Sequence, residues 1–566
     1  MGPLSQALGV PVLTALFLTA VLAPAQAQSS TWAPGATIQD AASIQVTRDG
    51  LDALGDVVPF VVPESFAFEP LSESGSLGCE YKIELSNGWV GIAVDDVRLI
   101  PRTNVLDLEA DLQVWVNDSG DPFQLTYGYC AFDECDSWIE PFPVYMTLPA
   151  TMDVVTDQDG NNVIDVTLGT VQYTHGLTTF HIENGTCVIL TIDEVLGFFG
   201  LSVIDFLIEN VVPFVLDEYI ADQMADIEAQ LEEALSAARF DDVIAIGATN
   251  LEVMVEPQDI DITPQGLEIY AQGRMFAEQG ECMVDRDPGG SLKTSTPVPD
   301  LTANPPGTQV AVHLSDDIGN EALYAVWRSG LFCYDLSEGG EIELPIPLNT
   351  SLLGIIGGEG FAALFPESKP MDIVTSPDLP PLVNYEGEHD IVAEIRELGV
   401  DFFAEVDYRQ TRALGIDLEV DAGVDLTFDG TLGELLLEVV LAPEDTVIIA
   451  SHNQLVKGSD ETVEDNFAGV LEVLLEVFLG ELLDPISFLI PSMNGVGLSS
   501  LSAGPTGGGD WLGVVAEVGE VPYDNSDAES GCGGEEGGCA TAAEGTAWWF
   551  LLGLPVFWVR RRGHRR

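Results

Sequence analysis

The chain has 566 residues, with 93 acidic against 19 basic residues and a formal net charge of −74. A surface this acidic repels phosphate, which argues against nucleic acid as a partner and against direct adhesion to anionic lipid. Hydrophobic residues make up 46% of the chain, enough to build cores, and the length predicts about two to four domains.

The first 27 residues have the pattern of a secretory signal. Residues 10–22 (VPVLTALFLTAVL) are an apolar core, and Ala25-Gln26-Ala27 is a small-x-small cleavage site. We therefore expect an exported protein whose mature chain begins near Gln28.

Two halves of the chain begin alike. The first opens with strand-like residues 44–46 (IQV), followed by Thr47 and the segment RDGLDALGDVV. The second opens with residues 310–314, followed by Ser315 and DDIGNEALYAVWRSG. Thr and Ser are good helix N-caps, and acids just after them favour a helix start. Each half therefore predicts a strand that leads into a capped helix.

Alternating apolar and polar residues follow each opening. The segments are residues 89–99 and 105–116 in the first half, and 400–408, 414–428 and 435–441 in the second. A period of two with acids on one face predicts antiparallel sheets that are half exposed to solvent.

Each half is then predicted to close with a long helix, over residues 191–239 and 466–488. In both, the apolar arc is wider than a surface helix requires, so each helix is expected to face a second apolar surface as well as a sheet. Residues 284–307, rich in Pro, Gly, Ser and Thr, are expected to form an extended interdomain linker.

The C-terminus is a separate unit. Residues 519–546 are an acidic, Gly-rich linker with Cys532 and Cys539, residues 547–559 (AWWFLLGLPVFWV) are a short apolar transmembrane segment, and residues 560–566 are an Arg-rich tail. This order resembles the myxobacterial-type C-terminal sorting segment. The resemblance implies sorting machinery as a partner, membrane contact before processing near the cysteine, and the outer surface of a Gram-negative bacterium or secretion. A fixed membrane anchor is the alternative.

Six further cysteines lie in the body of the chain. An even number in an exported protein favours structural disulfides over metal ligation, and the pairing cannot be deduced from sequence. The candidates are Cys79, Cys130, Cys135, Cys187, Cys282 and Cys333.

The order of elements resembles the bactericidal/permeability-increasing protein family, which includes lipopolysaccharide-binding and cholesteryl ester transfer proteins, within the tubular lipid-binding superfamily. The residues that carry it are IQVTRDGLDAL at 44–54 and VAVHLSDDIGNEALYAVWRSGLF at 310–332. The resemblance implies an α+β fold of two tandem tubular domains, residues 40–283 and 308–518. Each would be a highly twisted antiparallel sheet wrapped around long apolar helices, with lipid acyl chains in an apolar groove. The first half departs from the family by lacking the basic tip that captures lipopolysaccharide, which makes uncharged or zwitterionic lipid the safer inference.

The residues expected to line the grooves are apolar and lie on the predicted helices. They are Leu51, Leu54, Val58, Phe198, Phe199, Val203, Phe206, Leu207, Leu323, Tyr324, Trp327, Leu471, Leu474, Leu475 and Phe478.

The stretch TDQDGNNVID at 156–165 has two interpretations. Asp157, Asp159, Asn161 and Asp165 have the spacing of oxygen ligands in a calcium loop, although Asn162 stands where Gly is expected. The same residues favour a hairpin turn. Apart from this Ca²⁺ option we expect no cofactor.

No sequence motif of an enzyme is apparent: the histidines form no HExxH and no serine has a GxSxG setting. We therefore expect a non-enzymatic protein that binds lipid or another amphipathic ligand, with transfer of that ligand as a further option. A β-rich surface adhesin or structural module without a ligand, and a cryptic lipid hydrolase, remain the alternatives.

Overall fold

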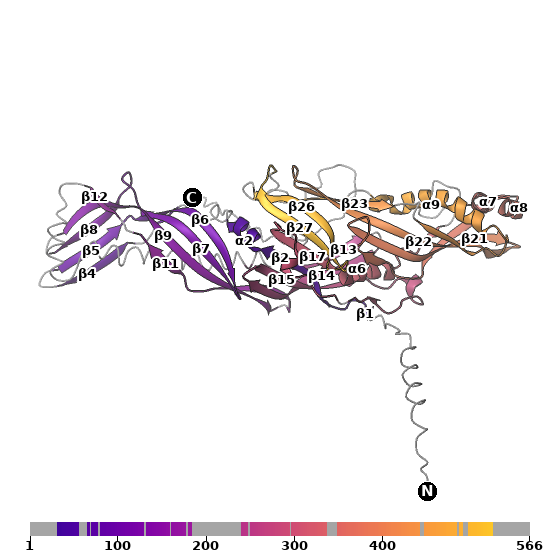
Figure 1. Ribbon diagram of the computed structural model, residues 1–566, viewed down its shortest axis with the longest axis horizontal. Helices are drawn as coiled ribbons and strands as arrows, with labels where there is room; N and C mark the ends of the chain where they lie inside the picture. Colours follow the sequence, from indigo (N-terminus) through magenta and orange to yellow (C-terminus); the bar gives the residue numbers. More distant parts are fainter. Residues whose placement is uncertain are drawn as a thin grey trace, which may run out of the picture.

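The computed structural model describes residues 31–55, 65–67, 70–76, 80–129, 132–158, 160–176, 179–183, 232, 239–246, 249–294, 296–336, 348–441, 446–483, 486–490 and 496–523. The molecule is elongated, with a curved sheet toward each end and a third sheet between them (Figure 1). The described residues are mostly strands, and their pairings are antiparallel.

The sheet at one end, here the first-half sheet, has ten strands in the order β3-β6-β7-β9-β8-β5-β4, and β10, β11 and β12 pair with β9. Two of the strands, β6 and β7, confirm the strands predicted over 89–99 and 105–116. The bounds are β3 Ser65–Ala67, β4 Leu71–Ser76, β5 Glu80–Ser86, β6 Trp89–Arg102, β7 Val105–Val116, β8 Phe123–Tyr129, β9 Phe132–Thr156, β10 Asn162–Leu168, β11 Gln172–His175 and β12 Phe180–Glu183.

The central sheet has seven strands in the order β13-β14-β15-β2-β17-β27-β26. Its middle pair joins the two segments that look alike in sequence, because β2 and β17 lie side by side with Val310 opposite Val46. Both halves of the chain therefore share one sheet. The bounds are β2 Ile38–Thr47, β13 Phe240–Ile246, β14 Thr249–Thr263, β15 Gly266–Phe276, β17 Val310–Ser315, β26 Val496–Thr506 and β27 Trp511–Glu520.

The sheet at the other end, here the second-half sheet, follows the order β18-β19-β21-β22-β23-β25, with β20 on β21 and β24 on β22. The alternating segments predicted at 400–408, 414–428 and 435–441 lie in its strands, except that Asp407 and Tyr408 form the turn between β21 and β22. The bounds are β18 Asp335–Leu336, β19 Met371–Pro377, β20 Leu382–Asn384, β21 Ile391–Val406, β22 Arg409–Asp429, β23 Glu434–Leu441, β24 Val447–His452 and β25 Ile486–Leu489.

The two predicted helix starts are confirmed. In α2 (Arg48–Gly55) the Thr47 hydroxyl accepts a hydrogen bond from the Gly50 amide, and in α6 (Asp316–Arg328) the Ser315 hydroxyl accepts one from the Ile318 amide. These bonds satisfy amide groups that the first turn of a helix leaves unpaired.

The helix predicted over 466–488 begins earlier and ends earlier. The observed helix α9 is Asp460–Leu483, and Phe488 lies in strand β25. The sequence continues Asp484-Pro485, and a residue before proline is disfavoured in helical conformation, which accounts for the earlier end.

Two short helices, α7 (Thr350–Gly357) and α8 (Glu359–Leu364), pack with α9 on the second-half sheet. Within the described ranges, no helix has both the length and the apolarity needed to cross a bilayer. The helix predicted over 191–239 lies outside the described residues apart from Glu232 and Arg239, as do the signal segment and residues 524–566.

Residues 284–307, predicted as a linker, are held closely against α6 and the central sheet, and we call them the strap. Within the strap, β16 (Ser291–Leu292) pairs with β1 (Thr31–Trp32), and short 3-10 turns lie just before it at Glu281–Met283 and within it at Leu301–Ala303. A disulfide between Cys282 and Cys333 ties its start to the chain that follows α6.

Candidate functional site

The seam between the first-half sheet and the central sheet is filled by one apolar cluster around α2. Leu51 is 2% exposed, and Leu54 packs against the same cluster. Its walls come from β6, β7, β9 and β10 on one side and from β2, β14, β15 and β27 on the other. Of the residues predicted to line a groove, Leu51 and Leu54 are thus placed between two sheets.

Helix α2 lies in direct backbone contact with its neighbours on both sides. A Cβ atom on Gly50 would lie 2.2 Å from the Gln309 carbonyl oxygen, and one on Gly55 would lie 2.5 Å from the Val97 carbonyl oxygen. Only glycine permits this approach, which explains the glycines at both positions. The helix is therefore fixed in place within the seam.

A pocket of about 390 Å³ opens at this seam. Met152 of β9 and Ile260 and Ile262 of β14 supply its apolar surface, and Asn104, Thr151 and Asp153 supply its polar groups. The backbone amide of Asn104 donates a hydrogen bond to the Ile262 carbonyl over 2.9 Å. This bond joins the tip of the β6–β7 hairpin to the central sheet. The exposed lining is at least as polar as it is apolar, and the volume is within the range of ligand sites.

None of the six pocket residues was predicted from the sequence. They come from three regions that are far apart in the chain, and the packing of one sheet against another brings them together. The alternation in β9 and β14 indicates which side chains face inward, but not which strand meets which.

On α6, Tyr324 and Trp327 are 1% and 0% exposed, and Leu323 is half-buried. Their neighbours are protein groups: Tyr324 and Trp327 cluster with Met283, Phe332 and Cys333 beside the disulfide. A lipid-lining role for them stays a prediction.

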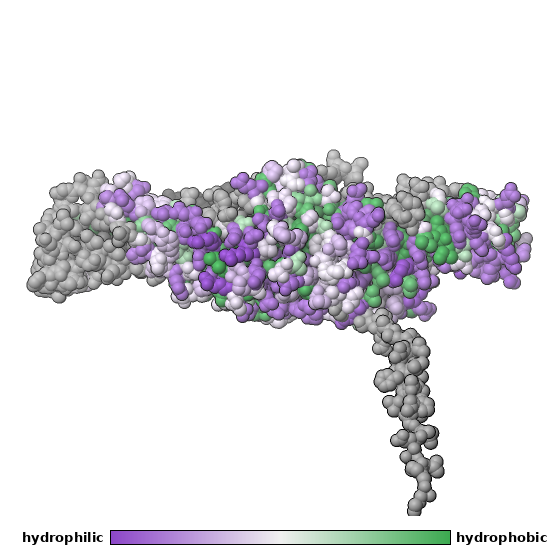
Figure 2. Space-filling model, in the orientation of Figure 1, coloured by the Kyte–Doolittle hydropathy of each residue, from purple (hydrophilic) through white to green (hydrophobic). Residues whose placement is uncertain are grey.

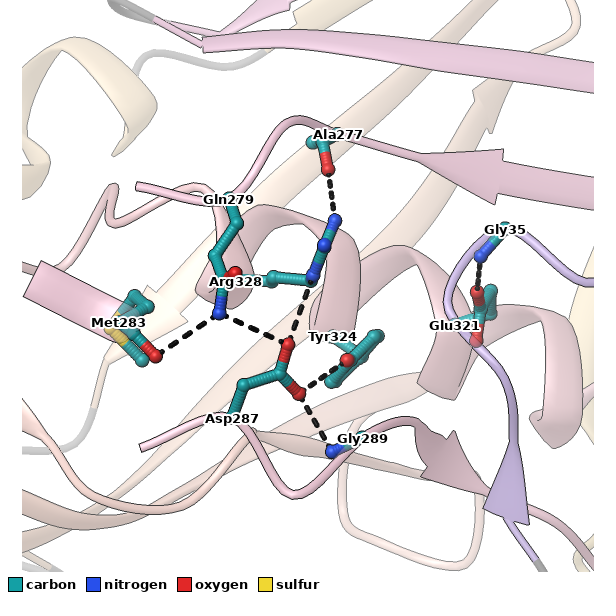
Figure 3. Close-up of polar contacts among 9 residues, drawn as sticks. All are labelled: Gly35, Ala277, Gln279, Met283, Asp287, Gly289, Glu321, Tyr324 and Arg328. Atoms are coloured by element: carbon teal, nitrogen blue, oxygen red, sulfur yellow. Dashed lines mark hydrogen bonds and ion pairs between the residues drawn. The ribbon is translucent and has the colours of Figure 1, made fainter. Parts of the chain in front are cut away.

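A polar network on α6 holds the strap (Figure 3). Asp287 accepts hydrogen bonds from the Tyr324 hydroxyl at 2.6 Å, from the Gly289 amide at 2.7 Å and from Arg328 at 3.0 Å. Burial alone would raise the pKa of Asp287, but these bonds outweigh it and hold that pKa below its usual value. The aspartate is thus a charged anchor and not a proton donor.

In the second half, α7, α8 and α9 close the inner face of the sheet with a dense cluster. Leu471 is 2% exposed, and the rings of Phe402 and Phe467 meet edge to face with centroids 6.1 Å apart. Leu471 therefore lies in a packed core. Leu474, Leu475 and Phe478 are on α9, but their side chains lie outside what the structure describes.

The other predicted site residues fall partly outside the described ranges. Cys282 and Cys333 form a disulfide, and Cys135 is also disulfide-bonded. Outside lie Val58, Phe198, Phe199, Val203, Phe206, Leu207, Cys79, Cys130, Cys187, Cys532, Cys539 and Asp159.

The stretch 156–165 forms a hairpin turn, with Thr156 of β9 paired to Asn162 of β10. Across it the Asp157 carboxylate accepts hydrogen bonds from the Asn161 amide and side chain, at 2.8 and 3.1 Å. The described residues contain no group of three or more His, Cys, Asp or Glu suited to hold a metal ion. Calcium binding here stays a prediction.

Comparison with known proteins gives a match at the level of fold. No protein-family model matches the chain and no curated protein matches it. Among solved structures, the lipopolysaccharide binding protein superposes with a TM-score of 0.51 and 13% identity, covering 87% of this chain and all of that one.

Two further matches have lower scores. P47 of Clostridium botulinum E1 has 6% identity and a TM-score of 0.26, and the match covers 85% of this chain and 100% of that one. Takeout 1 of Epiphyas postvittana has 12% identity and a TM-score of 0.21, and the match covers 30% of this chain and 81% of that one.

The order of the strands and the seven-stranded sheet shared by both halves give this chain the fold of the lipopolysaccharide binding protein.

Proposed function

We propose that the protein binds lipid acyl chains without catalysis, against the apolar cluster that borders the seam pocket. The observation that carries the proposal is the pocket itself: its lining residues Met152 and Ile262 belong to the apolar cluster that also contains Leu51 of α2. One solved structure with this fold is that of a lipopolysaccharide binding protein, which supports an amphipathic ligand.

The driving force would be the transfer of apolar chains out of water. Each buried CH₂ group contributes about 0.8 kcal/mol, so a long acyl chain gains several kcal/mol before the cost of association. The polar groups at the pocket, Asn104, Thr151 and Asp153, are placed to contact the head group.

The charge of the first half sets which head groups are tolerated. No Lys or Arg occurs between residues 103 and 238, and Asp153 lies at the pocket. Phosphate-rich heads would be repelled, so we propose uncharged or zwitterionic lipid. This class of lipid differs from lipopolysaccharide, the ligand named for the structural match.

We further propose export and delivery to the cell surface by the C-terminal segment, with sorting machinery as a partner. The proposal of export rests on the signal-like pattern of residues 1–27, and that of surface delivery on the pattern at residues 532–566. Mass spectrometry of the mature protein tests them, because processing near Cys532 or Cys539 would remove the apolar segment and the Arg-rich tail.

A blocking substitution tests the pocket. Ile260→Trp adds bulk at a half-buried lining position, and we expect it to reduce uptake of a fluorescent fatty acid about tenfold. Ile244→Trp is the matched control, since Ile244 is 41% exposed on strand β13 of the same sheet. Equal uptake by both variants would exclude the pocket as the route of entry.

The alternatives predict other results. An adhesin or structural module would take up no fatty acid in either form. A lipid hydrolase would release product from an ester substrate, and a single Ser→Ala substitution would abolish that release.

A further inference from the structure

Four aromatic side chains form a row on the first-half sheet, and we call Trp89, Trp115, Trp138 and His181 the aromatic row. They come from β6, β7, β9 and β12, which are neighbours in that order. The indoles of Trp89 and Trp115 meet edge to face, with centroids 6.5 Å apart and an angle of 85°. The Trp138 ring stacks on His181, with centroids 5.0 Å apart and an angle of 10°.

The aromatic row points away from the interior. The residues next to its members along the strands, Val90, Val116 and Ile139, are at most 3% exposed and face the core. Side chains alternate between the two faces of a strand, so the row lies on the outer face, where its members are half-buried.

The two ring pairs of the row lie on adjoining strands and together define one patch of the outer face. Trp138 and His181 are directly opposite each other in the ladder, and Trp115 lies across from Glu140 and Pro141. With about 4.8 Å between neighbouring strands, the patch spans roughly 15 Å. That is the size of a site for one small molecule.

The backbone fixes the first two rings. The Trp89 amide donates to the Asn117 side chain over 2.9 Å, and the Asn117 amide donates to the Trp89 carbonyl over 3.0 Å. The Trp115 indole lies over Gly91, where a Cβ atom would come within 2.0 Å of the ring. The Trp115 face is therefore held in position before any ligand arrives.

The surroundings of the row are strongly negative. No Lys or Arg occurs between residues 103 and 238, which include three of the four row members. The Glu140 carboxylate, 51% exposed, lies 2.6 Å from His181 Nε2 at the centre of the patch. Aromatic faces are themselves electron-rich, so rings and carboxylate together favour a cation and disfavour an anion.

Among the described residues this kind of contact occurs twice. The Lys293 ammonium lies 3.7 Å from the centroid of the Trp32 ring, and the Arg328 guanidinium carbon lies 5.5 Å from that of Phe276. At the aromatic row, no Lys or Arg lies on β7, β9 or β12, and the two arginines of β6, Arg98 and Arg102, pair with Asp111 and Asp107.

We propose that the aromatic row binds a quaternary ammonium group carried by a small soluble molecule. A quaternary ammonium is bulky and weakly hydrated, so it loses little solvation when it rests against indole faces. A soluble carrier is favoured over a membrane because β6, β7 and β9 run along the flank of the elongated molecule (Figure 1). A bilayer would have to lie along that acidic flank. The proposal does not depend on lipid binding at the seam.

Calorimetric titration with choline chloride tests the proposal. The control ligand is 3,3-dimethyl-1-butanol, which has the same shape without the charge, and sodium chloride controls for ionic strength. We expect choline to bind at least tenfold more tightly than the uncharged isostere.

Substitutions then locate the site. Trp89→Leu and Trp138→Leu should each weaken choline binding about fivefold, and Glu140→Gln about threefold. Tyr145→Leu is the matched control, because Tyr145 is a 53% exposed aromatic residue on β9 outside the row, and it should leave binding unchanged.

Several results would overturn the proposal. They are equal binding of choline and its isostere, no choline binding by the folded full-length protein, and binding to phosphatidylcholine vesicles or a neutral oligosaccharide without binding of free choline. If a Trp variant fails to fold, two measurements still test the proposal. They are the comparison of choline with its isostere on the unsubstituted protein, and choline binding by the Glu140→Gln variant.

Discussion

At the scale of single residues, α6 begins with carboxyl groups in an unusual setting. Asp316, Asp317 and Glu321 are 8%, 5% and 0% exposed. Burial raises the pKa of Asp316 to about 6 and raises that of Glu321. Burial also lowers the pKa of His313, on the preceding strand, to about 4. Between pH 4 and 6.5, a rise in pH lowers stability through Asp316 and raises it through His313, so these two shifts oppose each other.

The Asp316→Asn variant should separate these effects. Because the pKa of Asp316 is higher in the folded state, its contribution to stability is fully present below about pH 4 and is lost as the pH rises through 6. We expect Asp316→Asn to raise the free energy of unfolding relative to the parent by about 1–2 kcal/mol at pH 7.5, and by much less at pH 4. Urea denaturation at both pH values measures this; a difference that does not change with pH would refute the pKa assignment.

The glycines of the seam give a second prediction at this scale. Gly50→Ala should lower the free energy of unfolding by more than about 1 kcal/mol, because the new Cβ would overlap the Gln309 carbonyl. Gly469→Ala on α9 is the control: nothing lies within 4 Å of its Cβ position, so higher helix propensity should stabilise the protein by roughly 0.5–1 kcal/mol. The same sign for both variants would contradict the close packing of α2.

At the scale of elements, α6 links the strap to the central sheet. Asp287, Ser291 and Thr294 of the strap hydrogen bond to Tyr324, Glu321 and Asp316 of the helix respectively. The apolar face of α6 packs in the cluster that contains Met283. Carboxylates in the first turn of α6 accept hydrogen bonds from hydroxyl and amide groups of the strap.

Removal of one hydroxyl tests the strap. Tyr324→Phe deletes the 2.6 Å hydrogen bond to Asp287 and should lower the free energy of unfolding by roughly 1–3 kcal/mol. Tyr408→Phe is the matched control, since Tyr408 is 93% exposed on a hairpin, and it should have no effect. Equal unfolding midpoints for the two variants would show that the network adds nothing to stability.

Local features of the elements were predictable and contacts between them were not. Thr47 and Ser315 cap their helices because capping depends only on the next few residues. The strand over 105–116 matched β7 because alternation is local as well. The composition of the strap is that of a loop and predicts a linker, and only its hydrogen-bond partners on α6 show that it is packed.

At the scale of the whole molecule, the two halves are joined through the central sheet and not only through the strap. The similar openings of the halves, β2 and β17, pair with each other across 264 residues of sequence from Val46 to Val310. No periodicity in the sequence predicts such a pairing. For the same reason the residues of the seam pocket could not be predicted from the sequence. The family resemblance seen in the sequence predicts the fold, and only the structure shows the pocket at the seam.

Native mass spectrometry of the purified full-length protein, before and after organic extraction, tests lipid binding most directly. We predict additional mass that extraction removes, and an extract containing uncharged or zwitterionic lipids. A protein of bare polypeptide mass that also fails to take up a fluorescent fatty acid would contradict the account and favour a structural module with solid cores.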